Sequence, residues 1–197
     1  MDNALTLPAG PLATASQALA RQSVSPEIAE HSIRSFLFAR LVAVREGSLH
    51  DAAYDEDLLF AACVLHDLAL GRLGVGKARF EVEGADLAVP VLIEHGVSAA
   101  DVDRVWEAIA LHSLVGIADR RGLLTYLTHK GIFVDAGSVT DLDEEWLRQV
   151  YTVYPRPAGP AFILDAIVEH AARSEAAAPR YSMGAELLRQ RRAEAGS

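Results

Sequence analysis

The chain has 197 residues, of which 51% are hydrophobic, and a net charge of −9 from 27 acidic and 18 basic side chains. That length suits one domain with a sizeable core, and the composition excludes global disorder. The acidic balance argues against an extended nucleic-acid partner, because binding nucleic acid requires a basic stripe. The one cysteine, Cys63, cannot form an internal disulfide, which fits a reducing compartment.

Residues 1–24 are expected to form a partly flexible lead-in with one short helix at most. Pro8 and Pro11 interrupt its apolar stretches and no basic residue precedes them, so it does not have the pattern of a signal peptide. No window of the chain has the apolar length that a membrane span needs. We therefore expect a cytoplasmic protein with no membrane partner.

Helical signals begin at residue 25. Ser25 is a good N-cap, Pro26 suits the first helical position, and apolar residues then recur every three or four positions to about Arg45. Further helices are expected after Asp55, over about 81–94, after Ser98, over about 121–135, around Trp146 with Asp141 as its cap, and over about 160–173 and 183–192. The glycines at 71, 74 and 76 indicate a plain loop, since the spacing of a phosphate loop is absent.

No alternating strand pattern of useful length occurs, so the sequence predicts an all-α fold, a compact single-domain helical bundle. We expect the principal domain to cover residues 25–175 and a C-terminal helix or tail to cover 176–197.

The doublet His66-Asp67 ends the apolar run LLFAACVLHD, with His31 upstream and Asp135 downstream. Each of these groups lies on a separate predicted helix, and ligand sites in helical bundles are built from facing helices. A buried carboxylate beside a buried imidazole is costly unless something compensates both. A divalent metal does so, and zinc accepts these ligands, as do iron and manganese.

More extended motifs follow one another in order: HSIRSF at 31–36, VLHDLAL at 64–70, RFEVEGAD at 79–86, VWEAIALHS at 105–113, GI at 116–117, HKGIFVDAGS at 129–138 and YPR at 154–156. In these motifs the chain resembles the cyanamide hydratase-like branch of the HD-domain metal-dependent hydrolases. The resemblance covers about residues 25–175 and implies a mostly helical HD fold.

The resemblance also implies that His31, His66, Asp67 and Asp135 bind one catalytic metal, most readily zinc. It further implies that water activated by the metal is added to the nitrile-like group of a small-molecule substrate, as cyanamide becomes urea.

Several titratable residues could assist this chemistry. We expect His112 to be the proton donor, because imidazole titrates near neutrality, and Asp67 to be the second choice. Glu81 and Glu83 cannot share one helix face, and we expect Glu83 to point inward. Arg34 shares a face with His31, and it either bridges to Asp67 or Asp135 or is solvated.

The alternative is a dinuclear HD enzyme, a phosphohydrolase, phosphodiesterase or di-iron oxygenase, in which His95 and His112 bind the second metal. His95 stands at a predicted helix end, where a capping imidazole is the ordinary explanation. Leu70 and Gly71 occupy the stretch in which HD-type nucleotidases carry a catalytic glutamate, which weakens the phosphatase alternative. The role of His112 as donor, ligand or core side chain stays open, as does whether the chain forms a homo-oligomer.

Overall fold

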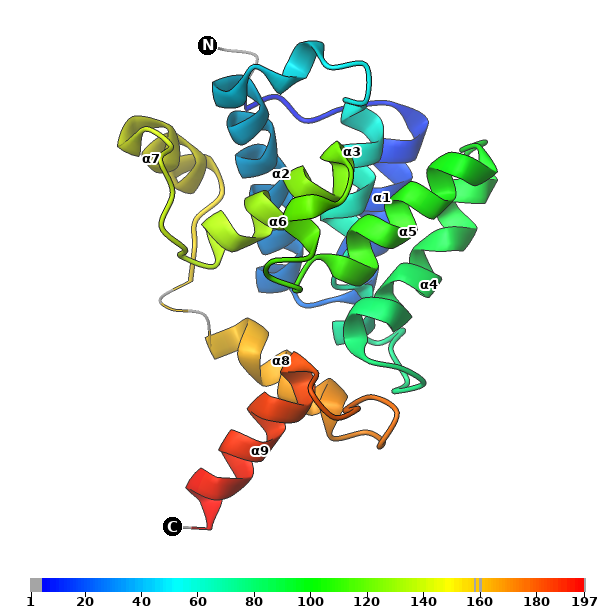
Figure 1. Ribbon diagram of the computed structural model, residues 1–197, viewed down its shortest axis with the longest axis vertical. Coiled ribbons are helices and arrows are strands. Elements are labelled where there is room, and N and C mark those ends of the chain that lie inside the picture. Colours follow the sequence, from blue (N-terminus) through cyan, green and yellow to red (C-terminus); the bar gives the residue numbers. More distant parts are fainter. Residues whose placement is uncertain (1–4, 158, 160, 197) are drawn as a thin grey trace.

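The computed structural model describes residues 5–157, 159 and 161–196, and these residues form α-helices and short 3-10 turns but no strand. The helices are α1 Pro11–Ser23, α2 Pro26–Glu46, α3 Glu56–Leu65, α4 Phe80–Glu94, α5 Ala99–Leu111, α6 Leu123–Asp135, α7 Glu144–Val153, α8 Ala161–Ala171 and α9 Met183–Ala195. The prediction of an all-α fold is confirmed, and Figure 1 shows the bundle they form.

Helices α2 and α6 pack against each other in the middle of the bundle (Figure 1), and the fully buried Phe36, Leu37 and Phe38 of α2 belong to the core. Their close approach depends on Gly131 in α6. A Cβ atom at that position would lie 2.7 Å from Cβ of Ala39 and would collide with the backbone of α2. Glycine is therefore the residue that allows these two helices to touch.

Within the lead-in, where one short helix was expected, residues 11–23 form a regular helix, α1, that packs against α3. Ala13, Ser16, Ala20 and Ser23 are its buried residues, and they recur on one helix face. Small side chains on this face let α1 lie close to the bundle, so tertiary packing stabilises a segment with little apolar bulk. Residues 1–4 of the predicted lead-in lie outside the described residues.

The predicted helix starts at Ser25, Asp55 and Ser98 are confirmed, since each side chain accepts a hydrogen bond from a backbone N–H of the first turn. The expected cap at Asp141 is wrong. Helix α7 begins two residues later, where Asp143 accepts from the N–H of Glu145 at 2.7 Å.

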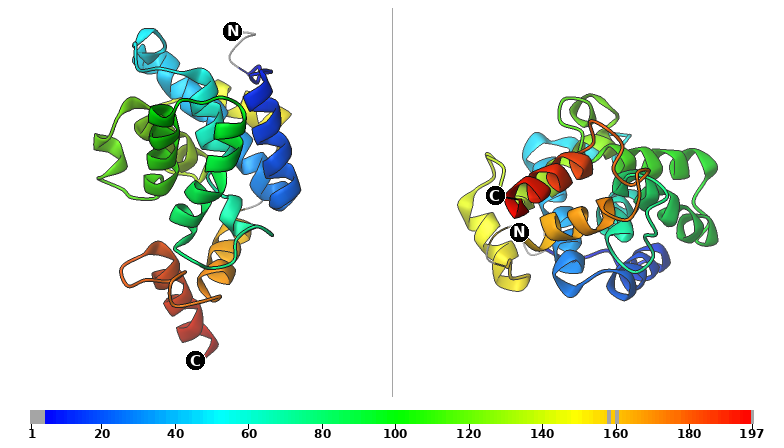
Figure 2. Two further views of the ribbon diagram at one scale, coloured as in Figure 1. Left: turned by 90° about the vertical axis from the view of Figure 1, so that its right-hand side faces the viewer. Right: turned by 90° about the horizontal axis from the view of Figure 1, so that it is seen from below.

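Helices α8 and α9 form a lobe at one end of the molecule, below the bundle in Figure 1 and in the left view of Figure 2. A small hydrophobic cluster joins this lobe to the bundle, with Ile167 of α8 packed among Ile28, Leu70 and Phe80. In addition, both ring nitrogens of His170 lie 3.0 Å from backbone carbonyls in the segment between α3 and α4. No helix within the described residues combines the length and the apolar character that crossing a membrane requires.

Candidate metal centre

Three side chains from two parts of the bundle converge at the end of the buried core. His31 comes from the second turn of α2, His66 follows the last residue of α3, and Asp67 comes next. One potential ligand atom from each lies within 4.8 Å of the other two, and all three residues are buried. Two imidazoles and one carboxylate at this separation form a donor set that zinc and similar divalent metals accept.

The orientation of both imidazole rings is fixed by their Nδ1 atoms. Nδ1 of His31 donates to Oδ2 of Asp135 at 2.6 Å, and Nδ1 of His66 donates to the carbonyl of Cys63 at 2.7 Å. With the proton held on Nδ1, each neutral ring presents a lone pair on Nε2. A histidine that binds a metal is usually held in this way by a partner on its other nitrogen.

Asp67 carries a buried oxygen that protein groups leave unsatisfied. Its Oδ2 lies 2.9 Å from Nε2 of His66 and 3.9 Å from Nε2 of His31, yet among the described residues it makes no hydrogen bond. A buried carboxylate oxygen facing two imidazole lone pairs is unfavourable unless a cation lies among them. The residues present therefore fit a divalent ion.

The ionisation of these groups also indicates a site for positive charge. Burial alone would raise the pKa of Asp67, but the neighbouring His66, together with His31 and His112, lowers it to about 2. Burial opposes the charged form of His66, but the charge of Asp67 prevails and raises its pKa. The carboxylate thus stays ionised and attracts either a proton or a metal ion to the adjacent nitrogen.

Three helices point their C-terminal ends toward this site. His66 caps α3, His112 caps α5, and Asp135 is the last residue of α6. The C-terminal end of a helix carries a partial negative charge of roughly half an elementary charge. The arrangement therefore adds backbone dipoles to the carboxylates in favouring a cation.

Asp135 lies beside this group, and both of its oxygens are engaged. Besides Nδ1 of His31, it accepts from Nε of Arg34 at 2.8 Å and from Nη2 at 3.0 Å. Of the alternatives for Arg34, the structure shows the bridge to Asp135, and Arg34 is completely buried rather than solvated. The ligand group of three does not include Asp135, so its role as a fourth ligand stays a prediction.

His112 lies next to His66, with their ring centroids 4.8 Å apart. Its Nδ1 donates to the carbonyl of Ile109 at 2.6 Å, so the lone pair of its neutral ring is on Nε2. Burial and the charge of His66 lower the pKa of His112 to about 4. At neutral pH the ring of His112 is therefore neutral, and it must accept a proton at Nε2 before it can donate one.

The expectation that Glu83 points toward the site is wrong. Its carboxylate accepts from the backbone N–H groups of Val75, Gly76 and Lys77 at 2.7 to 3.2 Å and so holds the glycine-rich loop. Glu81 is the residue near the site, because it accepts the hydroxyl proton of Ser113 at 2.5 Å. Both glutamates are buried, since α4 is covered at its first turn by the loop on one side and by the end of α5 on the other.

The second-metal pair of His95 and His112 is not formed. His95 caps the C-terminal end of α4, where its Nδ1 lies 2.9 Å from the carbonyl of Val91. Phe80, at the other end of this 15-residue helix, lies at the site. A rise of 1.5 Å per residue puts the two ends roughly 20 Å apart, too far for one ion.

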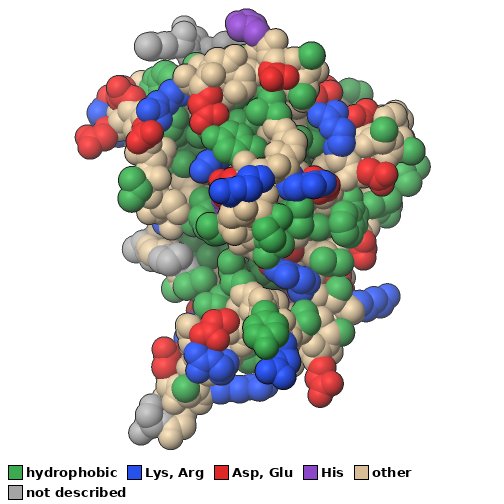
Figure 3. Space-filling view, viewed as in Figure 1, with side chains coloured by type: hydrophobic (Ala, Val, Ile, Leu, Met, Phe, Trp, Pro, Cys, Tyr) green, Lys and Arg blue, Asp and Glu red, His purple; other side chains and the backbone are tan. Residues whose placement is uncertain are grey.

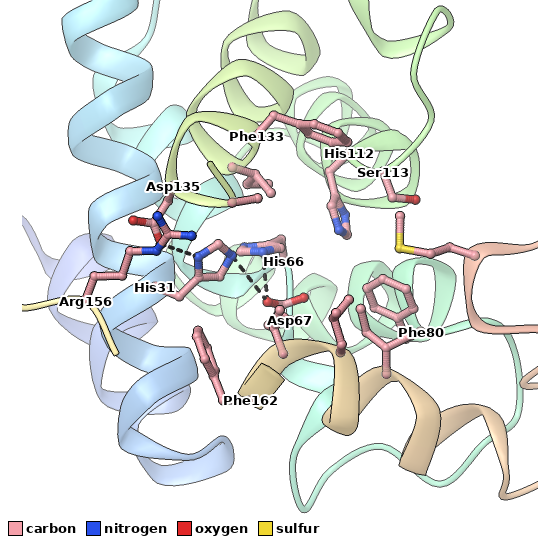
Figure 4. Close-up of a pocket in the computed structure, with 16 residues that line it drawn as sticks. His31, His66, Asp67, Phe80, His112, Ser113, Phe133, Asp135, Arg156 and Phe162 are labelled. Carbon is pink, nitrogen blue, oxygen red and sulfur yellow. Dashed lines mark hydrogen bonds and ion pairs between the residues drawn. The ribbon is translucent and has the colours of Figure 1, made fainter. Parts of the chain in front are cut away.

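A cavity of about 260 Å³ opens from this group. Figure 4 shows His31, His66, Asp67 and His112 along the cavity, and Phe133 is also part of its wall. Phe162 packs against the ring of His31 and Phe80 against the ring of His112. Hydrophobic side chains also gather at the waist between the bundle and the α8–α9 lobe on the face that Figure 3 shows.

Sequence reasoning missed the wall residues that α8 and α9 supply. Phe162, Ile163 and Ile167 of α8 and Met183 of α9 all line the cavity. The signal available in the sequence was the spacing of apolar residues in α8, which indicates a buried face but not the element that it covers. Arg156, the last residue of the motif YPR at 154–156, also lines the cavity, although no role at the site was predicted for it.

The family model of the HD domain matches residues 28–149, more than half of the chain. The match contains His31, His66, Asp67 and Asp135, and it ends within α7, before the lobe of α8 and α9. A search of curated proteins gave no match. An HD domain implies a metal-dependent, hydrolase-type function.

Proposed function

The chain belongs to the HD domain family, and on this basis we propose that it is a metal-dependent enzyme that adds water to a nitrile-like group, as in cyanamide. One observation carries the proposal: Asp67 Oδ2 is buried without a hydrogen bond and faces the Nε2 atoms of His31 and His66. We propose that these three residues hold the ion, with zinc as the first choice, because three protein ligands leave a coordination position open for chemistry.

When bound, a divalent ion lowers the pKa of a water molecule from about 15.7 to about 7 and so makes it a nucleophile at neutral pH. In this proposal Nε2 of His112 takes the proton that this water loses, and the hydrogen bond from Nδ1 to the Ile109 carbonyl supports that role because it leaves the lone pair on Nε2. The resulting imidazolium can then deliver a proton to the nitrile nitrogen. His112 thus acts first as base and then as acid.

In this three-ligand proposal Asp135 is not a fourth ligand, because both of its oxygens are engaged, and together with Arg34 it positions His31. The Arg34 guanidinium holds both oxygens of Asp135, and Oδ2 of Asp135 in turn holds Nδ1 of His31. This chain of contacts keeps Nε2 of His31 directed at Asp67. Partners of this kind usually change metal affinity or activity by 10- to 100-fold when they are removed.

The composition of the cavity wall favours an uncharged reacting group over a phosphate ester. Among the described residues that line the cavity, Arg156 is the one lysine or arginine, and most of the others are apolar. Phosphate recognition generally uses several charged or N–H donors around the group. The residues after the doublet, Leu70 and Gly71, provide no carboxylate either.

The proposal is tested by loading the metal-free protein with zinc and measuring urea formed from cyanamide. We expect turnover that requires zinc and is lost in His66→Gln. An exposed histidine far from the centre, His50→Gln, is the matched control and should retain the activity. Failure of the fully loaded protein to hydrate cyanamide or other nitriles would refute the proposal.

A further inference from the structure

We propose that the substrate is a cyanamide whose nitrogen carries an apolar substituent about the size of one aromatic ring. The inference rests on the proposed function, and it identifies the substrate class by the shape and chemistry of the cavity. The apolar part of the wall, formed by Phe80, Phe133, Phe162, Ile163, Ile167 and Met183, begins directly beside the candidate metal centre, because Phe162 packs edge-on to His31 and Phe80 to His112. A substrate whose nitrile group lies at the centre would therefore place its substituent against this apolar wall.

The volume of the cavity is too large for cyanamide alone. A closed apolar cavity of about 150 Å³ holds benzene, and one water accounts for about 30 Å³ of liquid. The cavity here measures about 260 Å³, which is room for a ring, a C≡N group, an ion and a water. Cyanamide by itself would leave the apolar wall in contact with water.

The wall that would contact the substituent comes largely from the C-terminal lobe. Ile163 and Ile167 of α8 and Met183 of α9 lie beyond residue 149, where the match to the HD domain ends. The residues that hold the ion lie within the match. In this chain the lobe therefore supplies the apolar surface that contacts the substituent, whereas the HD domain supplies the residues that hold the ion.

The reacting end of the cavity favours a group that carries an N–H. The hydroxyl proton of Ser113 is donated to Glu81, which leaves the Oγ lone pairs as the available hydrogen-bonding capacity of that side chain. Ser113 lines the cavity beside His112. An N-substituted cyanamide offers an N–H next to the nitrile carbon, whereas a simple nitrile does not.

The reaction is balanced without a further reactant. Water forms a C–O bond to the nitrile carbon of R–NH–C≡N as one C–N π bond opens, and one of its protons reaches the terminal nitrogen through His112, which gives the isourea R–NH–C(OH)=NH. Transfer of the second proton from oxygen to the same nitrogen then gives the substituted urea R–NH–CO–NH₂. No electrons are transferred and no group leaves. The apolar substituent R stays in contact with α8 and α9 throughout.

The test compares urea with phenylurea as ligands of the zinc-loaded protein by titration calorimetry, which needs no turnover. Burial of a ring should make phenylurea bind roughly 10- to 100-fold more tightly. Ile163→Ala should reduce this preference by roughly three- to tenfold, because it removes part of the wall. Val168→Ala, on the same helix but outside the cavity lining, is the matched control and should not. If Ile163→Ala does not fold, Met183→Ala replaces it.

The outcomes separate this inference from the proposed function. Equal affinity for urea and phenylurea, or a preference that both wall variants leave unchanged, would overturn the inference. Hydration of cyanamide with exclusion of phenylurea would overturn it while the proposed function stands. Tight binding of phenylurea that depends on Ile163, with no hydration of cyanamide or phenylcyanamide, would support the ligand class and refute the reaction.

Discussion

Replacement of Arg34 by methionine should strongly destabilise the protein, although Arg34 is not expected to touch the substrate. The side chain is completely buried and holds both oxygens of Asp135 as well as the carbonyl of Pro155. Methionine fills similar space but leaves the Asp135 carboxylate with His31 as its remaining partner. Breaking a buried ion pair from one side usually costs about 3–5 kcal/mol.

The loss can be measured by urea unfolding of the metal-free protein, with two further variants to identify its cause. Arg34→Lys keeps a charge but lacks the planar guanidinium that contacts both Asp135 and the carbonyl of Pro155, so it should lie between wild type and Arg34→Met. Asp135→Asn combined with Arg34→Met removes both charges, and it should recover much of the loss. A double variant as unstable as the single one would show that the ion pair is not the cause.

The same variants should differ in their response to pH. Burial would raise the pKa of Asp135, but hydrogen bonds from His31 and Arg34 lower it below 3.8. Its contribution to stability is therefore present above pH 3.8 and is lost as the pH falls through the lower folded value. In Arg34→Met the charge of Asp135 has lost its arginine partner, so protonation of Asp135 in acid reduces the destabilisation of the variant. The difference between wild type and variant should be largest near pH 7 and shrink toward pH 4. A loss below about 1 kcal/mol, or a difference independent of pH, would refute this reasoning.

Three other predictions concern single residues. Asp67→Ala should lower the zinc content per chain and abolish turnover, and full occupancy by elemental analysis with normal turnover would contradict its role as ligand. His112→Gln should keep the zinc but lower kcat by roughly 10²- to 10⁴-fold, while an unchanged rate would make the ring a core side chain. Glu83→Gln should weaken the hydrogen bonds to the loop at residues 75–77 and speed amide hydrogen exchange there by roughly tenfold or more, since bonds to a charged group contribute about 1.5–3 kcal/mol. Exchange at wild-type rates in that variant would show that the loop is held by other contacts.

The helix starts could be predicted because an N-cap is a local signal in the sequence. The candidate ligands could be predicted because their order along the chain is a recognisable pattern. Ser25, Asp55 and Ser98 each cap the turn that follows them, and a cap needs no distant partner. At α7, however, the expected cap Asp141 precedes the actual cap Asp143 by two residues. The buried Leu142 lies between them and belongs to the core, and the helix begins after it, at the cap Asp143.

The roles of Glu81 and Glu83 could not be predicted, because each depends on a partner that is distant in the chain or in an irregular loop. A helix-face argument treats α4 as having one buried side, whereas its first turn is covered on two sides. The apolar wall from α8 was missed for the same reason. Helical periodicity shows that Ile163 and Ile167 share a buried surface, but which cavity that surface closes is decided by the docking of the whole lobe.

The contact at Gly131 has a consequence for how substitutions in this enzyme should be interpreted. Asp135 lies one turn further along α6, on the same face, and its partners His31 and Arg34 come from the helix that Gly131 touches. A single methyl group at position 131 would push the two helix axes apart and stretch every bond between them. Selection on metal affinity would therefore act on Gly131, although glycine has no side chain that could bind the ion. In a mutational scan we expect Gly131 to be as intolerant as a ligand.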